Sequence, residues 1–261
     1  MLSYARGPDA PLAEIGIDEQ FSATASKYPD RDALIVPHQQ ARFTYSQLRS
    51  EVERVARGLR GLGLEHGDRF GVWASNCAEW VLLQLAAAKA GVVLVNVNPA
   101  YRAHELEFVL RKSRMRALFL HSRDEHSDYR SLLEEARAGG GLALERTVYL
   151  GTSGWSAMLD GGRDLGPRKP ACSDVANMQY TSGTTGSPKG VLLTHRNILN
   201  NGRYIAMRLR MTCLDRICAP VPMYHCFGCV IGTMAAASSG AALILPAPRF
   251  HAQATMDSIE R

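Results

Sequence analysis

The chain has 261 residues, of which 46% are apolar and 21% are charged, and its 30 Lys+Arg against 25 Asp+Glu leave a formal net charge of +5. This composition excludes a disordered or fibrous chain, and the length is sufficient for one or two domains with a hydrophobic core. Because the positive charge is modest and spread along the chain, it does not indicate a nucleic-acid partner.

The cysteines and the apolar segments indicate the cellular location of the protein. Six cysteines in a chain of this size do not make the framework of a small secreted disulfide protein. Segment 1–15 has prolines and acidic residues where a signal peptide needs an apolar run. The apolar stretch 80–97 is interrupted by Gln84, Lys89 and Gly91, which favours a buried helix followed by a buried strand over a membrane span. We therefore expect a cytoplasmic protein without an integral membrane segment.

The first predicted elements alternate between helix and strand. In chain order, the sequence predicts a helix over 18–27 capped by Asp18, a strand over 33–36, a turn over 37–41 and a short returning strand over 42–44. Thr44 and Gln47 then form a capping-box pattern. They open a helix whose apolar residues recur at helical spacing until the glycines at 61 and 63.

A second alternation follows. The sequence predicts a strand over 69–74, a helix capped by Asn76 and running to residue 90, a buried strand over 92–97, a helix over 105–114 and a strand over 117–120. This alternation predicts an α/β fold in which helices cover parallel-rich sheets. The pattern weakens over 124–171, where glycines and prolines indicate loops. We place a boundary near residue 170, which divides the chain into units 1–170 and 171–261.

The segment with the clearest chemistry runs from Tyr180 to Gly190. It combines three glycines, five hydroxyl side chains and one lysine within eleven residues, and strand-like segments flank it on both sides, so we expect a hairpin tip. Glycines let successive backbone N–H groups surround an anion, hydroxyls donate to phosphate oxygens, and Lys189 adds a positive charge. The spacing differs from the loop of strand–GxxxxGK[ST]–helix NTPases, which disfavours a P-loop phosphotransferase. A plain surface loop is the other interpretation.

Residues 180–197 resemble the phosphate-loop signature of the adenylate-forming (AMP-dependent synthetase/ligase) superfamily, which includes acyl-CoA synthetases, luciferases and peptide-synthetase adenylation domains. That signature is close to [YF]TSGTTGxPKGVxxSHxN, and Thr194 replaces its usual serine. Further similarities are Asn76, the run Asn98-Pro99-x-Tyr101, and 222–228 (Pro-Met-Tyr-His-Cys-Phe-Gly). Within the superfamily the chain is most similar to the N-terminal part of medium-chain fatty acyl-CoA synthetases.

The resemblance implies a two-step activation of a carboxylic acid, with ATP, Mg²⁺ and CoA taking part. It implies that Lys189 and Thr184 act in catalysis and that His225 lies at the carboxylate end of the acyl pocket, where it positions the acid. The residues expected to hold the β- and γ-phosphates are Thr181, Ser182, Gly183, Thr184, Thr185, Gly186, Ser187, Pro188 and Lys189. No protein residue is expected to bind a metal, and the partners are small molecules; the sequence leaves the oligomeric state open.

Other interpretations of the same residues remain. His225 alone could be a core histidine, and Cys226-x-x-Cys229 could indicate zinc or redox chemistry, although small buried packing residues are favoured there. The superfamily carries further motifs for adenine, ribose and a C-terminal lysine that are absent from 1–261, so we expect a fold that is incomplete at its C-terminus and a chain that is inactive alone. The alternatives are a non-catalytic nucleotide-binding remnant and an adenylation domain that feeds a carrier protein.

Overall fold

The computed structural model describes residues 10–181 and 188–260. Its helices are α1 (Ile17–Lys27), η1 (Pro37–Gln39), α2 (Tyr45–Gly61), α3 (Ala78–Ala90), α4 (Ala103–Ser113), α5 (Tyr129–Arg137), α6 (Ser153–Asp160), α7 (His195–Arg208), η2 (Phe227–Met234), α8 (Ala235–Ser239) and α9 (Ala252–Glu260). Its strands are β1 (Asp32–Val36), β2 (Ala41–Thr44), β3 (Arg69–Trp73), β4 (Val93–Asn96), β5 (Ala117–Leu120), β6 (Arg146–Tyr149), β7 (Val175–Thr181), β8 (Lys189–Thr194), β9 (Arg216–Cys218) and β10 (Ala242–Ile244).

The larger sheet is mostly parallel, with the strand order β6-β5-β3-β4-β7-β8. Every neighbouring pair from β6 to β7 is parallel, and β8 pairs antiparallel with β7 at the edge. The smaller sheet has the order β2-β1-β10-β9, in which β1, β10 and β9 are parallel and β2 returns antiparallel to β1. The predicted class, parallel-rich sheets covered by helices, is confirmed.

Both sheets draw strands from distant parts of the chain. β7 and β8 join the larger sheet next to β4, and β9 and β10 join the smaller sheet next to β1. Each sheet therefore contains strands from before and after residue 170. The division into units 1–170 and 171–261 stays a prediction.

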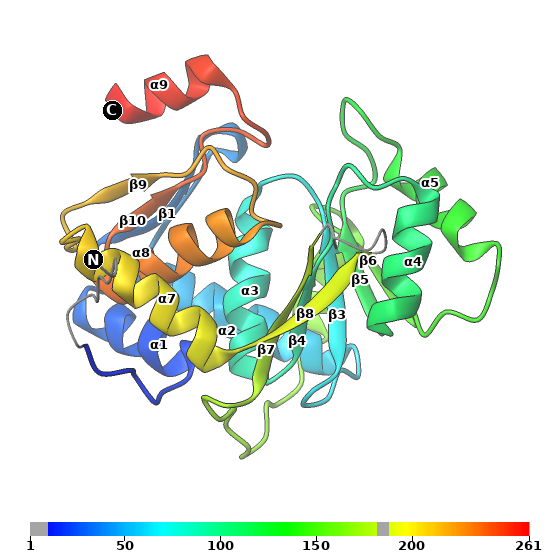
Figure 1. Cartoon of the computed structure of the whole chain (residues 1–261), viewed down its shortest axis with the longest axis horizontal. Coiled ribbons are helices and arrows are strands. Elements are labelled where there is room, and N and C mark those ends of the chain that lie inside the picture. Colours follow the sequence, from blue (N-terminus) through cyan, green and yellow to red (C-terminus); the bar gives the residue numbers. More distant parts are fainter. Residues whose placement is uncertain (1–9, 182–187, 261) are drawn as a thin grey trace, which may run out of the picture.

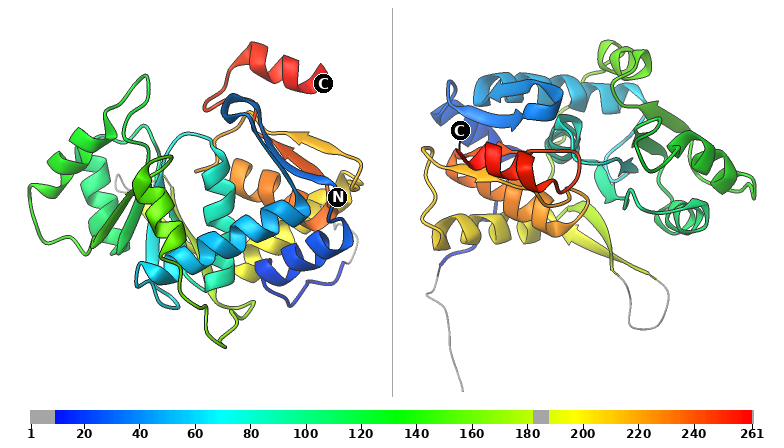
Figure 2. Two further views of the ribbon diagram at one scale, coloured as in Figure 1. Left: turned by 180° about the vertical axis from the view of Figure 1, so that it is seen from behind. Right: turned by 90° about the horizontal axis from the view of Figure 1, so that it is seen from above.

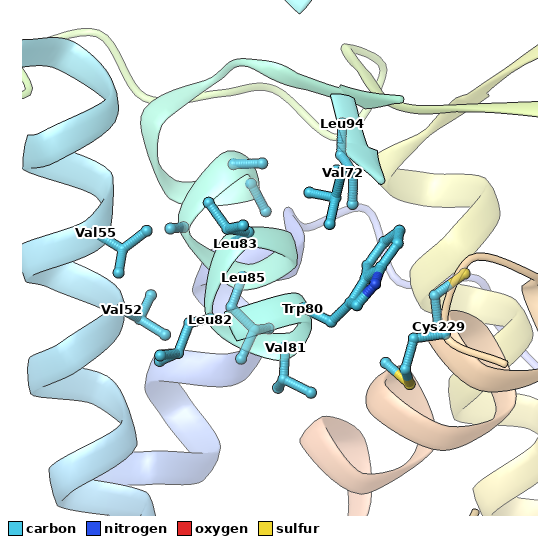
Figure 3. Close-up of a cluster of buried hydrophobic side chains, with 14 of the residues drawn as sticks. Val52, Val55, Val72, Trp80, Val81, Leu82, Leu83, Leu85, Leu94 and Cys229 are labelled. Carbon is cyan, nitrogen blue, oxygen red and sulfur yellow. The ribbon is translucent and has the colours of Figure 1, made fainter. Parts of the chain in front are cut away.

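The core lies in two layers, one on each face of the larger sheet. One cluster fills the space between the two sheets, where α3 lies (Figure 1), and includes Trp80, Leu83 and Leu94 (Figure 3). The other lies under α4 and α5 on the opposite face and includes Val95 and Leu106. Neighbouring residues of β4 enter opposite clusters because successive side chains of a strand point to opposite faces. The stretch 80–97 is thus a buried helix and a buried strand, as predicted.

Helix starts were predicted with mixed success. The capping box at α2 is confirmed, because Thr44 Oγ1 accepts from the Gln47 N–H at 3.2 Å and Gln47 Oε1 accepts from the Thr44 N–H at 2.9 Å. The prediction for Asp18 is wrong, because Gly16 is the N-cap of α1 and Asp18 lies in its first turn. The prediction for Asn76 is also wrong: α3 begins after Cys77, and the Ala78 N–H donates instead to Gln39 Oε1 at 2.7 Å.

Structure also forms where the sequence pattern is weak. Helices α5 and α6 and strand β6 lie within 124–171. They are short, with nine residues in α5, eight in α6 and four in β6, so each offers little length for a repeating pattern. Figure 2 shows α9 over the smaller sheet, on the face opposite α8, and α9 has no buried residue. Within 10–181 and 188–260, no helix is both long and apolar enough to cross a membrane.

Candidate functional site

Three strands of the larger sheet end at one edge. Because β3, β4 and β7 are parallel, their carboxyl ends bring Asn76, Asn96 and Thr181 to the same side of the sheet. Ligands of open α/β sheets bind outside the carboxyl ends of parallel strands. This edge is therefore the place in the fold at which chemistry is expected.

The predicted hairpin around the glycine-rich segment is confirmed on both of its strands. β7 and β8 pair antiparallel, with Tyr180 opposite Gly190 and Thr181 opposite Lys189. Thr181 and Lys189 are exposed and Pro188 is partly exposed. A Cβ at Gly190 would meet the terminal methyl of Met178, the flexible end of a side chain. The candidate residues that lie outside the described part of the chain are Ser182, Gly183, Thr184, Thr185, Gly186 and Ser187.

The segment 221–229 forms a tight turn beside this edge. The His225 N–H donates to the Pro222 carbonyl at 3.2 Å, and the His225 carbonyl accepts from the N–H groups of Gly228 and Cys229 at 3.0 and 3.1 Å. A Cβ at Gly228 would lie 2.5 Å from the Pro222 carbonyl oxygen and 2.8 Å from Met223 Cα. Only glycine allows the two ends of this turn to approach so closely.

The turn exposes the imidazole of His225. Its Nδ1 accepts a hydrogen bond from the Phe227 N–H at 3.1 Å. A nitrogen that accepts cannot carry the proton, so the neutral ring carries its proton on Nε2. His225 is exposed, not a core histidine. The arrangement presents an N–H donor to any ligand held against the turn.

Asn76 holds this turn from the larger sheet, a role that its prediction as a helix cap missed. Its Nδ2 donates to the Val221 carbonyl at 2.9 Å, and its Oδ1 accepts from the Met223 N–H at 2.8 Å. The side-chain amide thus pairs with the backbone as a neighbouring strand would. The partners lie about 145 residues later in the chain, so no local sequence signal could have identified them.

The two cysteines of the C-x-x-C differ in exposure. Cys226 is exposed, with its Sγ 3.6 Å from His225 Nδ1. Cys229 is buried, and burial raises the pKa of its thiol to about 12. The thiol is therefore neutral at physiological pH, and its sulfur accepts from Gln179 Nε2 at 3.3 Å and from Asn96 Nδ2 at 3.6 Å. All six cysteines are free thiols.

The tyrosine that opens the loop is also neutral. Burial raises the pKa of the Tyr180 phenol to about 12, and its hydroxyl donates to the Val109 carbonyl at 3.5 Å. Among the residues that the structure describes, no group of three or more His, Cys, Asp or Glu side chains could hold a metal ion.

Known proteins are similar to this chain in sequence. Residues 21–261 match the family described as AMP-binding enzyme. The chain is 38% identical to the medium-chain acyl-CoA ligase ACSF2 of mouse mitochondria over 290 residues, which cover all of this chain and 47% of that protein. It is 39% identical to the putative acyl-CoA synthetase YngI of Bacillus subtilis, covering 97% of this chain and 50% of that protein.

A solved structure has a similar fold. The inhibitor-bound N-terminal domain of FACL13 from Mycobacterium tuberculosis superposes with a TM-score of 0.83 and 26% identity, covering 94% of this chain and 60% of that one. The chain spans about half the length of the curated relatives that it matches. The family match covers nearly every residue, and the motifs on which the resemblance rested lie within it. The chain therefore belongs to the AMP-binding enzyme family.

Proposed function

We propose that this chain supplies the phosphate loop and the acid-facing turn of an ATP-dependent acid–thiol ligase. The observation that carries the proposal is the β7–β8 hairpin: it leads from the carboxyl edge of a parallel sheet into a segment of glycines and hydroxyls and returns at Lys189. The turn with His225 is anchored at the same edge by Asn76. A phosphate-binding segment and a donor for a carboxylate thus belong to one region of the fold.

In the first step, a carboxylate oxygen attacks the α-phosphorus of ATP, an acyl-adenylate forms and pyrophosphate leaves. Negative charge grows on the leaving pyrophosphate. Donors arranged in advance around it stabilise that charge without reorganisation. We assign this role to residues 181–189, with Lys189 and Thr184 as the catalytic groups. Mg²⁺ bound to the phosphate oxygens supplies further neutralising charge, and no step here depends on a protein ligand for it.

His225 has a positioning role in this proposal. A carboxylic acid is already ionised near pH 7, so the first step needs no general base. The imidazole accepts the Phe227 N–H at Nδ1 and keeps its proton on Nε2, so it can donate to one carboxylate oxygen. That hydrogen bond would orient the other oxygen towards phosphorus.

In the second step, the thiol of CoA attacks the acyl carbon and AMP leaves. We propose a medium-chain fatty acid as the acyl substrate, because the mouse relative is a medium-chain acyl-CoA ligase of which 47% is matched. We propose a reducing compartment such as the cytoplasm, because the six cysteines are all free. Units 1–170 and 171–261 would be the first and second subdomains of the adenylate-forming domain.

ATP binding to the purified 261-residue chain tests the phosphate site. Titration calorimetry should show that Lys189→Ala weakens ATP binding about 10- to 100-fold, because a hydrogen bond to a charged group contributes about 1.5–3 kcal/mol. Lys112→Ala, which removes an exposed lysine from α4, is the matched control and should bind as the parent does. Equal affinity of the parent and Lys189→Ala would contradict the proposed phosphate site.

A pyrophosphate-release assay with octanoate, ATP and CoA tests the second part of the proposal. We expect little or no turnover from the 261-residue chain alone, because the superfamily's adenine, ribose and C-terminal lysine motifs are absent from it. Robust turnover would show that these contacts are not needed for activity.

A further inference from the structure

The turn 221–229 is held by side-chain amides of the larger sheet. Asn76, after β3, binds both Val221 and Met223. Asn96, the last residue of β4, donates from Nδ2 to the Tyr224 carbonyl at 2.9 Å. These amides contact the backbone of the turn, so they fix its position whatever its side chains are. His225 follows directly after the last of these anchored residues.

A second asparagine sets the orientation of the Asn96 amide. Asn177 of β7 donates from Nδ2 to Asn96 Oδ1 at 2.7 Å and to the Leu94 carbonyl at 2.8 Å. Because Asn96 Oδ1 accepts from Asn177, the Asn96 NH₂ group must face Tyr224. The chain of hydrogen bonds therefore runs from β7, the strand that leads into the phosphate loop, through β4 to the turn that carries His225.

This network is costly to bury, which argues against a purely stabilising role. Asn96 and Asn177 are only 4% and 3% exposed. Asn177 Oδ1 is buried and has no hydrogen-bond partner among the described residues. An unsatisfied buried amide oxygen is unfavourable compared with an apolar side chain of similar size. The amides at these places are thus better explained by the geometry that they impose than by the stability that they add.

We propose that Asn96, oriented by Asn177, is a positioning residue that couples the phosphate-loop strand to the acid-facing turn. Asn76 is the second positioning residue, at the start of the turn. The ligand that the turn receives is a medium-chain carboxylate, so this inference rests on the proposed function. Loss of the Asn96 contact frees the Tyr224 carbonyl and lets His225 move away from its working position, while the apolar core stays packed.

The two cysteines of the turn report on this network, and Cys229 touches it, because Asn96 Nδ2 also donates to the Cys229 sulfur at 3.6 Å. Cys226 is exposed beside His225, whereas Cys229 is buried in the cluster of Figure 3. Alkylation by iodoacetamide, followed by mass spectrometry of the peptides, should label Cys226 quickly and Cys229 slowly in the parent. In Asn96→Leu we expect the labelling rate of Cys229 to rise at least tenfold, with a small change in thermal midpoint.

A binding readout separates positioning from stability. Octanoate should protect Cys226 of the parent from alkylation, and the concentration needed should rise about tenfold in Asn96→Leu. Asn96→Gln, which keeps the amide, should recover part of the protection. Asn200→Leu is the matched control: Asn200 is a buried asparagine that binds Ala13 and Arg196 and makes no contact in this network, so its protection should match the parent's.

Two results would overturn the inference: unchanged Cys229 labelling and octanoate protection in Asn96→Leu, or equal effects in Asn96→Leu and Asn200→Leu. Either result would mean that the side-chain amides of Asn96 and Asn177 do not position the turn. Failure of the proposed function gives a different result. Lys189→Ala would then bind ATP as tightly as the parent, whereas the labelling rate of Cys229 in Asn96→Leu would still test the hydrogen-bond network.

Discussion

Replacement of Gly228 by alanine should disrupt the turn that carries His225. The new Cβ would lie 2.5 Å from the Pro222 carbonyl oxygen, and 2.8 Å from both the carbonyl carbon of Pro222 and Met223 Cα. All three are backbone atoms, so no side-chain rotation relieves the overlap. The turn must open by about 0.9 Å to reach ordinary contact at 3.4 Å. That movement stretches the hydrogen bonds from Asn76 to Val221 and Met223.

Overpacking of this kind typically lowers the free energy of unfolding by about 1–3 kcal/mol. For a chain of this size, that corresponds to a fall in Tm of about 2–12 °C. Gly232→Ala is the matched control in the same helix, because its Cβ would meet only the Leu243 methyl at 3.3 Å and the Ala219 methyl at 3.8 Å. Alanine there should leave Tm unchanged or raise it slightly, since glycine is unfavourable within a helix.

Thermal unfolding followed by circular dichroism compares the two variants. The alkylation rate of Cys229 adds a local measurement, and it should rise in Gly228→Ala but not in Gly232→Ala. A Tm of Gly228→Ala within about 1 °C of the parent, with slow labelling of Cys229, would refute the reasoning, because the turn would then have room for a side chain.

Two further predictions concern the parts of the fold that support the site. Thr44→Ala should lower the free energy of unfolding by about 0.5–2 kcal/mol, measured in urea, because it removes the capping box of α2; Ser46→Ala, an exposed position one residue into that helix, should change it far less. Burial lowers the pKa of His195 to about 4; the nearby His66 lowers it further, and the charge of Asp174 opposes the shift. The Nδ1 atom of His195 accepts a hydrogen bond from the Ile17 N–H at 3.3 Å. Between about pH 4 and the ordinary histidine pKa of about 6.5, the unfolded chain binds more protons than the folded chain. The contribution of neutral His195 to the free energy of unfolding is therefore complete above about pH 6.5 and is lost as the pH falls towards 4, by up to about 3 kcal/mol. His195→Asn should flatten the decline of urea midpoints between pH 7.5 and 4.5, and an unchanged slope would contradict the assignment.

The features that depended only on near neighbours could be predicted from the sequence. The capping box of Thr44 and Gln47 involves residues three positions apart, and the β7–β8 hairpin follows from two strand-like segments around a glycine-rich tip. The parallel-rich class followed from the alternation of helices and strands, because a parallel pair needs a covering connection. The family resemblance also followed from contiguous motifs, and residues 21–261 match that family.

Only the tertiary structure decided how the distant side chains are used. The sequence around Asn76 is typical of a helix cap, yet its side-chain amide binds the backbone of Val221 and Met223. Gln39 accepts the hydrogen bond from the first N–H of α3 instead. The orientation of Asn96 depends on Asn177, which lies 81 residues later and is adjacent only because β4 and β7 pair. A sequence pattern records which groups could form hydrogen bonds. Which bonds form is decided by the partners that the packed sheets bring within about 3 Å.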